Sequence, residues 1–234
     1  MPAHSKGKIF LASDRGHTET DWFRSYSTFS FGAYQIGHKN SFGDLYVLND
    51  DTLAGGKSLS LTAESDSQIF LLPTVGAINY KDDNGNDLLL EAGECLIIFL
   101  LKNTGFQVFN PYDDALINVV QLWFKTPVPS VQKIAEPILF DIEANKNRLI
   151  KIFPMPVSSP SPGLFIGKFD GRKDAIINLE NTTNAAFFFV LEGAFEVADR
   201  LLETRDGLAL WDIKDIELEA LSANAVLLVI TIQL

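Results

Sequence analysis

The feature that most constrains this chain is that its apolar residues come in short runs separated by turn-forming residues. From Ser58 to Glu64, apolar and polar residues alternate with a period of two, which is typical of a strand with one buried face. Asn84-Gly85 stands between two further apolar stretches, and this dipeptide favours a tight hairpin. The sequence shows no long amphipathic helix of 3.6-residue period. It therefore predicts an all-β protein.

Glycine positions indicate that the chain contains two related halves. Gly76 and Gly193 each follow one apolar run and precede another, and they are separated by 117 residues, half of the chain length of 234. A further glycine follows each of them, at Gly93 and Gly207. Such repetition favours a duplicated unit, although chance recurrence of common strand–glycine–strand patterns is the alternative.

Proline marks where the two halves would join. Pro127-Val128-Pro129-Ser130 comes after the last strand pattern of the first half, and proline has no N–H to donate inside a sheet. We therefore expect two small antiparallel β-barrels in tandem, at residues 1–130 and 131–234.

Composition excludes several classes of partner. With 19 basic and 30 acidic residues, the net charge is −11, and such a surface repels nucleic-acid phosphates. The single cysteine, Cys95, excludes an internal disulfide and suits a reducing compartment; its apolar surroundings predict a buried, inert thiol. No stretch approaches the ~20 apolar residues of a membrane helix. We expect a cytoplasmic protein that binds neither membrane nor nucleic acid directly.

Several motifs resemble the pirin family. Near the N-terminus they are Arg15-Gly16-His17, Trp22-Phe23 and Thr28-Phe29-Ser30-Phe31, followed by Val47-Leu48-Asn49-Asp50-Asp51. The later segment Asp206-Gly207-Leu208-Ala209-Leu210-Trp211-Asp212 is similar to one in bacterial pirin-like quercetinases. The resemblance covers nearly the whole chain. It implies a bicupin, a tandem of two cupin-type (jelly-roll) antiparallel β-barrels.

The resemblance also implies a metal site, which this chain does not reproduce. In the family, three histidines and one glutamate of the N-terminal barrel hold an iron-type metal. Counting back from Gly76 and from Asn110-Pro111 gives the four corresponding positions, which are Thr62, Glu64, Phe106 and Val108. Only one of them carries a strong ligand for such a metal.

Histidines elsewhere in the chain do not restore the site. The chain has three, His4, His17 and His38, and none follows position 38, so no shift of the alignment supplies the missing ligands. We therefore predict that the chain holds no metal and no other cofactor.

Three functional hypotheses follow for the four aligned positions. The first is a metal-free binding or regulatory protein, in which Thr62, Glu64, Phe106 and Val108 either line a pocket for a small organic ligand or close it as core. The second is a metal-independent enzyme in which Glu64 acts as general acid or base. The third is a quercetin 2,3-dioxygenase-like enzyme with a reorganised metal site that uses His17 or His38. Because residues two apart point to the same side of a strand, we predict that Thr62 and Glu64 face the interior of the first barrel; the alternative is that Glu64 lies solvated at the barrel mouth.

Overall fold

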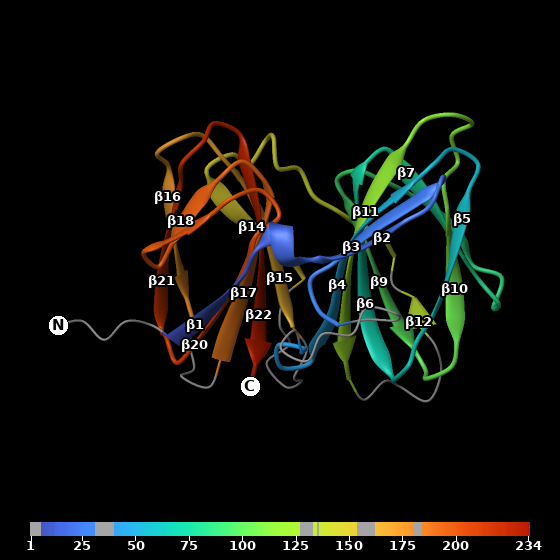
Figure 1. Ribbon diagram of the computed structural model, residues 1–234, viewed down its shortest axis with the longest axis horizontal. Coiled ribbons are helices and arrows are strands. Elements are labelled where there is room, and N and C mark those ends of the chain that lie inside the picture. Colours follow the sequence, from blue (N-terminus) through green and yellow to red (C-terminus); the bar gives the residue numbers. More distant parts are fainter. Residues whose placement is uncertain (1–5, 31–39, 127–132, 135, 154–161, 180–183) are drawn as a thin grey trace. The chain divides into compact units, whose positions relative to one another are not determined.

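The computed structural model of this protein consists of β-strands joined by turns, with a short 3₁₀-helix, η1, at Ala12–Asp14. It describes residues 6–30, 40–126, 133–134, 136–153, 162–179 and 184–234 (Figure 1). The all-β prediction is confirmed. In the described ranges, no helix has the length and apolar character needed to cross a membrane. The chain forms a first unit, Gly16–Phe140, and a second unit that combines Met1–Arg15 with Asp141–Leu234.

The first unit contains two antiparallel sheets. The larger sheet has the order β12-β9-β6-β11-β4-β3-β2, with β13 also paired to β9, and the smaller has the order β5-β10-β7-β8. The strands of this unit are β2 (Gly16–Glu19), β3 (Phe23–Ser27), β4 (Leu45–Leu53), β5 (Ser58–Thr62), β6 (Ser67–Val75), β7 (Ala77–Asp82), β8 (Asp87–Glu91), β9 (Glu94–Leu100), β10 (Gly105–Phe109), β11 (Ile117–Lys125), β12 (Lys133–Ile134) and β13 (Ile138–Leu139).

The second unit also contains two antiparallel sheets. Their orders are β1-β20-β17-β22-β15-β14 and β16-β21-β18-β19. The strands are β1 (Lys6–Phe10), β14 (Arg148–Phe153), β15 (Gly163–Phe169), β16 (Asp174–Asn178), β17 (Asn184–Glu192), β18 (Phe195–Val197), β19 (Arg200–Leu202), β20 (Gly207–Trp211), β21 (Asp215–Ala220) and β22 (Ala225–Gln233).

The two units repeat one strand order. The smaller sheets correspond strand by strand, and the larger sheets share the sequence β9-β6-β11-β4 in one unit and β20-β17-β22-β15 in the other. Gly76 and Gly193 occupy equivalent turns of the two units. Gly76 lies between β6 and β7 with a φ angle of 74°, and Gly193 lies between β17 and β18 with a φ angle of 76°. This left-handed backbone region suits glycine. The repeat inferred from the glycine spacing is therefore present in the structure.

Each unit encloses its own core between its two sheets. The first core includes Ile69, Leu96 and Trp123 from the larger sheet with Tyr80 and Phe106 from the smaller one. In the second unit, residues from both sheets likewise share one core. Within the described residues the two sheets of a unit are separate hydrogen-bonded ladders. The expectation of closed barrels is therefore wrong in this detail, and each unit is an open two-sheet arrangement.

The division between the units differs from the expected boundary at 130/131. After the proline segment at residues 127–130, which lies outside the described residues, the chain belongs to the first unit, where β12 and β13 both pair with β9. The backbone N–H of Phe140 then donates to Gly93 O at 2.8 Å. The first strand, β1, instead pairs with β20 of the second unit. The pairing of β12 and β13 with β9 therefore assigns these segments to the first unit, although the prolines predicted that this unit ends before them.

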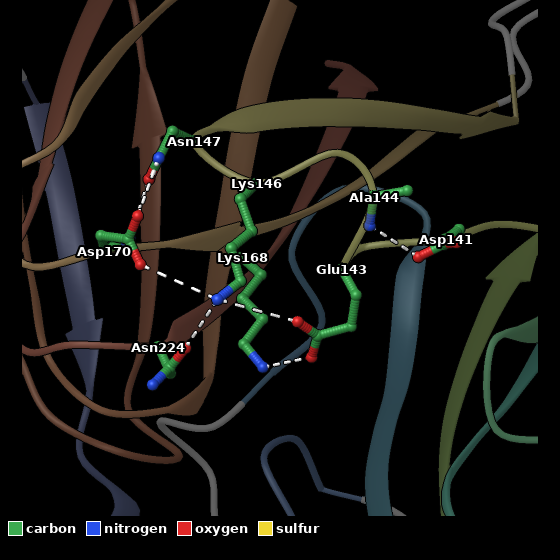
Figure 2. A network of polar contacts seen from close by, with 8 residues as sticks. All are labelled: Asp141, Glu143, Ala144, Lys146, Asn147, Lys168, Asp170 and Asn224. Carbon is green, nitrogen blue, oxygen red and sulfur yellow. Dashed lines mark hydrogen bonds and ion pairs between the residues drawn. The ribbon is translucent and has the colours of Figure 1, made fainter.

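A polar network holds the start of Asp141–Leu234 to its own unit (Figure 2). Lys168 forms an ion pair with Glu143, and Lys146 Nζ lies 3.2 Å from Asn224 Oδ1. Asn147 Nδ2 donates to Asp170 Oδ2 at 3.0 Å, and Asn147 Oδ1 accepts from the Asp170 N–H at 2.8 Å. These contacts tie the turn before β14 to β15 and to the turn before β22, which explains why this turn belongs to the second unit.

Candidate functional site

The structure reverses the expected orientation of β5. Thr62 and Glu64 are exposed, whereas Leu59 and Leu61 pack against the core of the first unit and Ala63 is fully buried. The strand pairs with β10 so that Leu61 lies opposite Phe106 and Leu59 opposite Val108. Burial of two leucine side chains favours this register over one that would bury Glu64. The prediction that Thr62 and Glu64 face inward is therefore wrong.

Phe106 and Val108 do face inward, as predicted, and Phe106 belongs to an aromatic cluster. Its ring stacks on Tyr80 with centroids 5.5 Å apart and lies 5.8 Å from the ring of Trp123. Trp123 in turn meets the Tyr46 ring edge-on at 6.3 Å. Three of these side chains are at most 3% exposed and Tyr46 is 9% exposed. The interior next to Phe106 is thus occupied by packed rings.

The four aligned positions do not fit a metal ion. Two of them, Phe106 and Val108, have no donor atom, and the two that have oxygen atoms point away from the core. In the described ranges, no three His, Cys, Asp or Glu side chains come together as a metal-binding group. A first-row metal needs several such ligands at one point. The donor set therefore disagrees with the metal site that the resemblance implies.

Of the three histidines, only His17 lies in the described residues. It stands on β2, where its ring stacks on Tyr26 at 4.8 Å and its Nε2 atom lies 3.3 Å from Glu19. Its side chain is 44% exposed. These contacts are those of a surface residue on an edge strand. His4 and His38 lie outside the described residues.

Glu64 lines a shallow groove at one end of the first unit. The groove has a volume of about 580 Å³, and its lining residues are Asp44, Glu64, Ser65, Asp66, Lys102, Lys125 and Thr126. The Lys102 N–H donates to Asp66 Oδ1 at 2.8 Å, and the Lys125 N–H donates to Asp44 O at 2.9 Å. The backbone of the groove is therefore well fixed. Its charged, exposed lining places Glu64 at the mouth of the unit and not in an apolar pocket.

Sequence reasoning missed a row of buried polar side chains on the inner face of the larger sheet. We call Ser25, Ser27, Asn49, Asp51 and Gln121 the polar stripe; each is at most 8% exposed. Gln121 Nε2 donates to Asp51 Oδ2, and Trp123 Nε1 donates to Gln121 Oε1 at 3.0 Å. Among the residues that the structure describes, none forms a hydrogen bond with Asn49 Oδ1. The available signal was the polar segment Asn49-Asp50-Asp51-Thr52, which directly continues the apolar run that begins at Leu45.

Two further groups match or refine the sequence analysis. Cys95 is completely buried, and that burial raises the pKa of its thiol well above the ordinary value, which confirms the expectation of an unreactive cysteine. Burial also raises the pKa of the Tyr46 hydroxyl, which lies 2.6 Å from Ser67 Oγ. Neither group is available as a nucleophile near neutral pH.

Comparison with known proteins identifies the chain's relatives. Residues 163–231 match the family model described as quercetinase C-terminal cupin domain. Quercetin 2,3-dioxygenase of Escherichia coli K12 is 25% identical over 229 residues, which are 93% of this chain and 95% of that protein. Pirin-like protein YhaK of the same organism is 27% identical over 124 residues, about half of each chain (51% and 53%).

The chain resembles the pirins. The fold agrees: bacterial pirin YhhW from Escherichia coli, solved in complex with nickel(II), aligns with a TM-score of 0.81 at 21% identity over 97% of this chain and 99% of that one. A second YhhW structure aligns with a TM-score of 0.83 at 22% identity, over 96% and 97% of the two chains.

Proposed function

We propose that this protein acts as a binding protein that uses no metal centre in its first unit. The observation that carries the proposal is the position of Phe106, which is buried between the rings of Tyr80 and Trp123 where the family resemblance calls for a histidine ligand. A benzyl side chain packed on two sides contributes to the stability of the core and offers no lone pair to a metal. The absence of a ligand atom at position 106 and the packing of the Phe106 ring in the core both support a function without a metal ion in the first unit.

The packed interior also decides where a partner would bind. A small organic ligand at the aligned positions would have to displace Phe106 or Val108, and removal of such packed side chains costs several kcal/mol. Binding at the surface of the protein carries no such cost. We therefore place the binding function on the surface. The acidic charge and the reduced, buried Cys95 suit work in the cytoplasm.

An enzyme that uses Glu64 without metal is not supported by its surroundings. A general acid of raised pKa requires an apolar enclosure, and Glu64 instead lies in an open groove with Lys102 and Lys125. Quercetin 2,3-dioxygenase-like activity is the second candidate. It is favoured by the sequence likeness to the Escherichia coli enzyme over 93% of this chain, and it would need ligands from outside the four aligned positions.

Metal analysis joined to an activity assay separates these candidates. The full chain is produced in medium supplemented with iron, nickel and manganese, and the quercetin 2,3-dioxygenase of Escherichia coli is prepared in parallel as the control. We expect well under one metal ion per chain in this protein, and no loss of quercetin absorbance when it is incubated with quercetin and oxygen. One tightly held metal per chain together with quercetin turnover would overturn the proposal.

A further inference from the structure

The outer face of the smaller sheet in the second unit combines exposed apolar and acidic side chains. Side chains of this sheet such as Phe195, Ile216 and Leu218 point into the core, so the alternate residues point outward. Ile176 and Leu201 lie outward on the two edge strands, β16 and β19, with 58% and 68% of their surface exposed. The outward carboxylates are Asp174, Glu196, Asp215, Glu217 and Glu219. We call this surface the β16–β19 face.

Three of these carboxylates lie in one row across neighbouring strands. Glu219 on β21 is directly opposite Asp174 on β16 and directly opposite Glu196 on β18. Like charges at directly opposed positions destabilise a sheet. Arg172 Nη1 lies 3.1 Å from Glu219 Oε1. In the part of the chain that the structure describes, no ion pair reaches Asp174 or Glu196.

The equivalent sheet of the first unit shows that the fold does not require this charge. There the row at the same distance from the turn glycine, across β5, β10, β7 and β8, consists of Ser58, Phe109, Asn79 and Leu89, none of which is charged. In the next outward row, formed by Ser60, Gln107, Lys81 and Asp87, the ion pair of Lys81 with Asp87 measures 3.0 Å and Gln107 Nε2 donates to Ser60 Oγ at 3.4 Å. The matching row of the first unit therefore carries no charge, whereas the row of the second unit sets acidic side chains opposite one another.

The chemistry of the β16–β19 face excludes most classes of partner. Its carboxylates do not form a metal-binding group among the described residues. Nucleic acids and anionic membranes are repelled by it, and so is a second copy of this chain that presents the same face. Ile176 and Leu201, on the two edge strands of the sheet, add exposed apolar surface that a small cation does not cover. A polypeptide with both basic and apolar side chains satisfies all of these conditions.

We propose that the β16–β19 face docks a basic protein segment, whose lysine or arginine side chains pair with the carboxylate row while its apolar side chains cover Ile176 and Leu201. The inference rests on the proposed binding function and names the surface and the class of partner. Complementary charge gives such contacts their orientation and rate of association, and apolar contact provides the buried area.

The probe is a short synthetic peptide that alternates lysine with valine, titrated into the full-length protein at low ionic strength. Glu196→Gln with Glu217→Gln removes two charges from the β16–β19 face. Asp87→Asn with Glu91→Gln removes two charges from the matching face of the first unit and is the control of equal net charge. We expect the first pair to weaken binding roughly tenfold and the control pair to change it less than about twofold.

A second pair of variants tests the apolar part of the surface. Ile176→Ser with Leu201→Ser is expected to weaken binding several-fold, whereas Leu89→Ser, on the exposed edge strand β8 of the first unit, is the control and is expected to leave it unchanged. The proposal is overturned if the peptide does not bind, if both charge pairs weaken binding equally, or if the serine variants bind as the unchanged protein does. None of these results depends on metal content, so a failed docking surface and a failed proposed function remain distinguishable.

Discussion

The two units share one strand order but carry their polar side chains in opposite places. In the first unit the polar stripe lies inside, facing the core, while the matching outer row of the smaller sheet is uncharged. In the second unit the interior is apolar and the outer row is acidic. A duplicated backbone therefore tolerates either arrangement, and what differs between the units reflects specialisation and not the needs of the fold.

Matched positions make the internal difference concrete. Gln121 on β11 lies opposite Leu71 and Asn49, and the corresponding Val229 on β22 lies opposite Phe188 and Phe165. Leu71 and Phe188 each stand five residues before their turn glycine. Buried amides and carboxylates are costly unless hydrogen-bonded. The first unit thus has a polar interior next to an aromatic cluster, whereas the matched positions Val229, Phe188 and Phe165 of the second unit carry hydrocarbon side chains.

The largest expected effect comes from removing one buried aromatic ring from the core of each unit, which tests whether both cores are packed. Phe106→Ala in the first unit and Phe195→Ala in the second are each expected to lower the free energy of unfolding by about 3–5 kcal/mol. Denaturant titration followed by tryptophan fluorescence measures both. If Phe106→Ala costs under about 1 kcal/mol while Phe195→Ala costs several, the interior of the first unit is open and an internal ligand becomes the better hypothesis.

The polar stripe gives the next largest contrast. Gln121→Leu removes the donor to Asp51 and the acceptor for the Trp123 N–H, and we expect a loss of about 1–3 kcal/mol for the groups left buried. The matched change Val229→Leu alters only apolar packing and should cost less than about 1.5 kcal/mol. Equal costs in the same denaturant experiment would show that the hydrogen bonds of the stripe contribute little.

The acidic row predicts a stabilising substitution. Glu196→Gln relieves the repulsion with Glu219 and should raise the stability of the protein by about 0.2–1 kcal/mol at low salt, with less effect at high salt. Glu91→Gln on the first unit is the control and should leave the thermal midpoint unchanged. A lower midpoint for Glu196→Gln would mean that its carboxylate is stabilised within the sheet, against the account given for the β16–β19 face.

The smallest effect concerns the polar network of Figure 2 and depends on pH. The hydrogen bond from Lys168 lowers the pKa of Glu143 below its ordinary value of 4.5. A carboxyl group with a lowered folded-state pKa contributes stability that is present above pH 4.5 and is lost as the pH falls through the folded value. The stability difference between the unchanged protein and Lys168→Gln should therefore shrink in acid. A difference that grows below pH 4.5 contradicts this assignment.

The sequence predicted the strand content, the repeat and the inward position of Phe106, because each depends on local pattern or on a well-matched turn. It failed for Thr62 and Glu64, since a shift of one residue in a strand exchanges its two faces, and the count from Gly76 carried no information about that shift. The pairing of β5 with β10, in which Leu61 lies opposite Phe106, determines which face of β5 is buried. The acidic row was also beyond prediction, because strand register alone brings Asp174, Glu196 and Glu219 together.

The most direct test of the central claim is a calorimetric titration of the metal-free, full-length protein with nickel(II), the ion present in the YhhW structure. The aligned positions offer no converging ligands, and the rings around Phe106 occupy the interior. The account predicts no saturable one-to-one binding, with only the weak heat of surface carboxylates that disappears in added salt. Saturable binding of one nickel(II) per chain that persists in salt would contradict it.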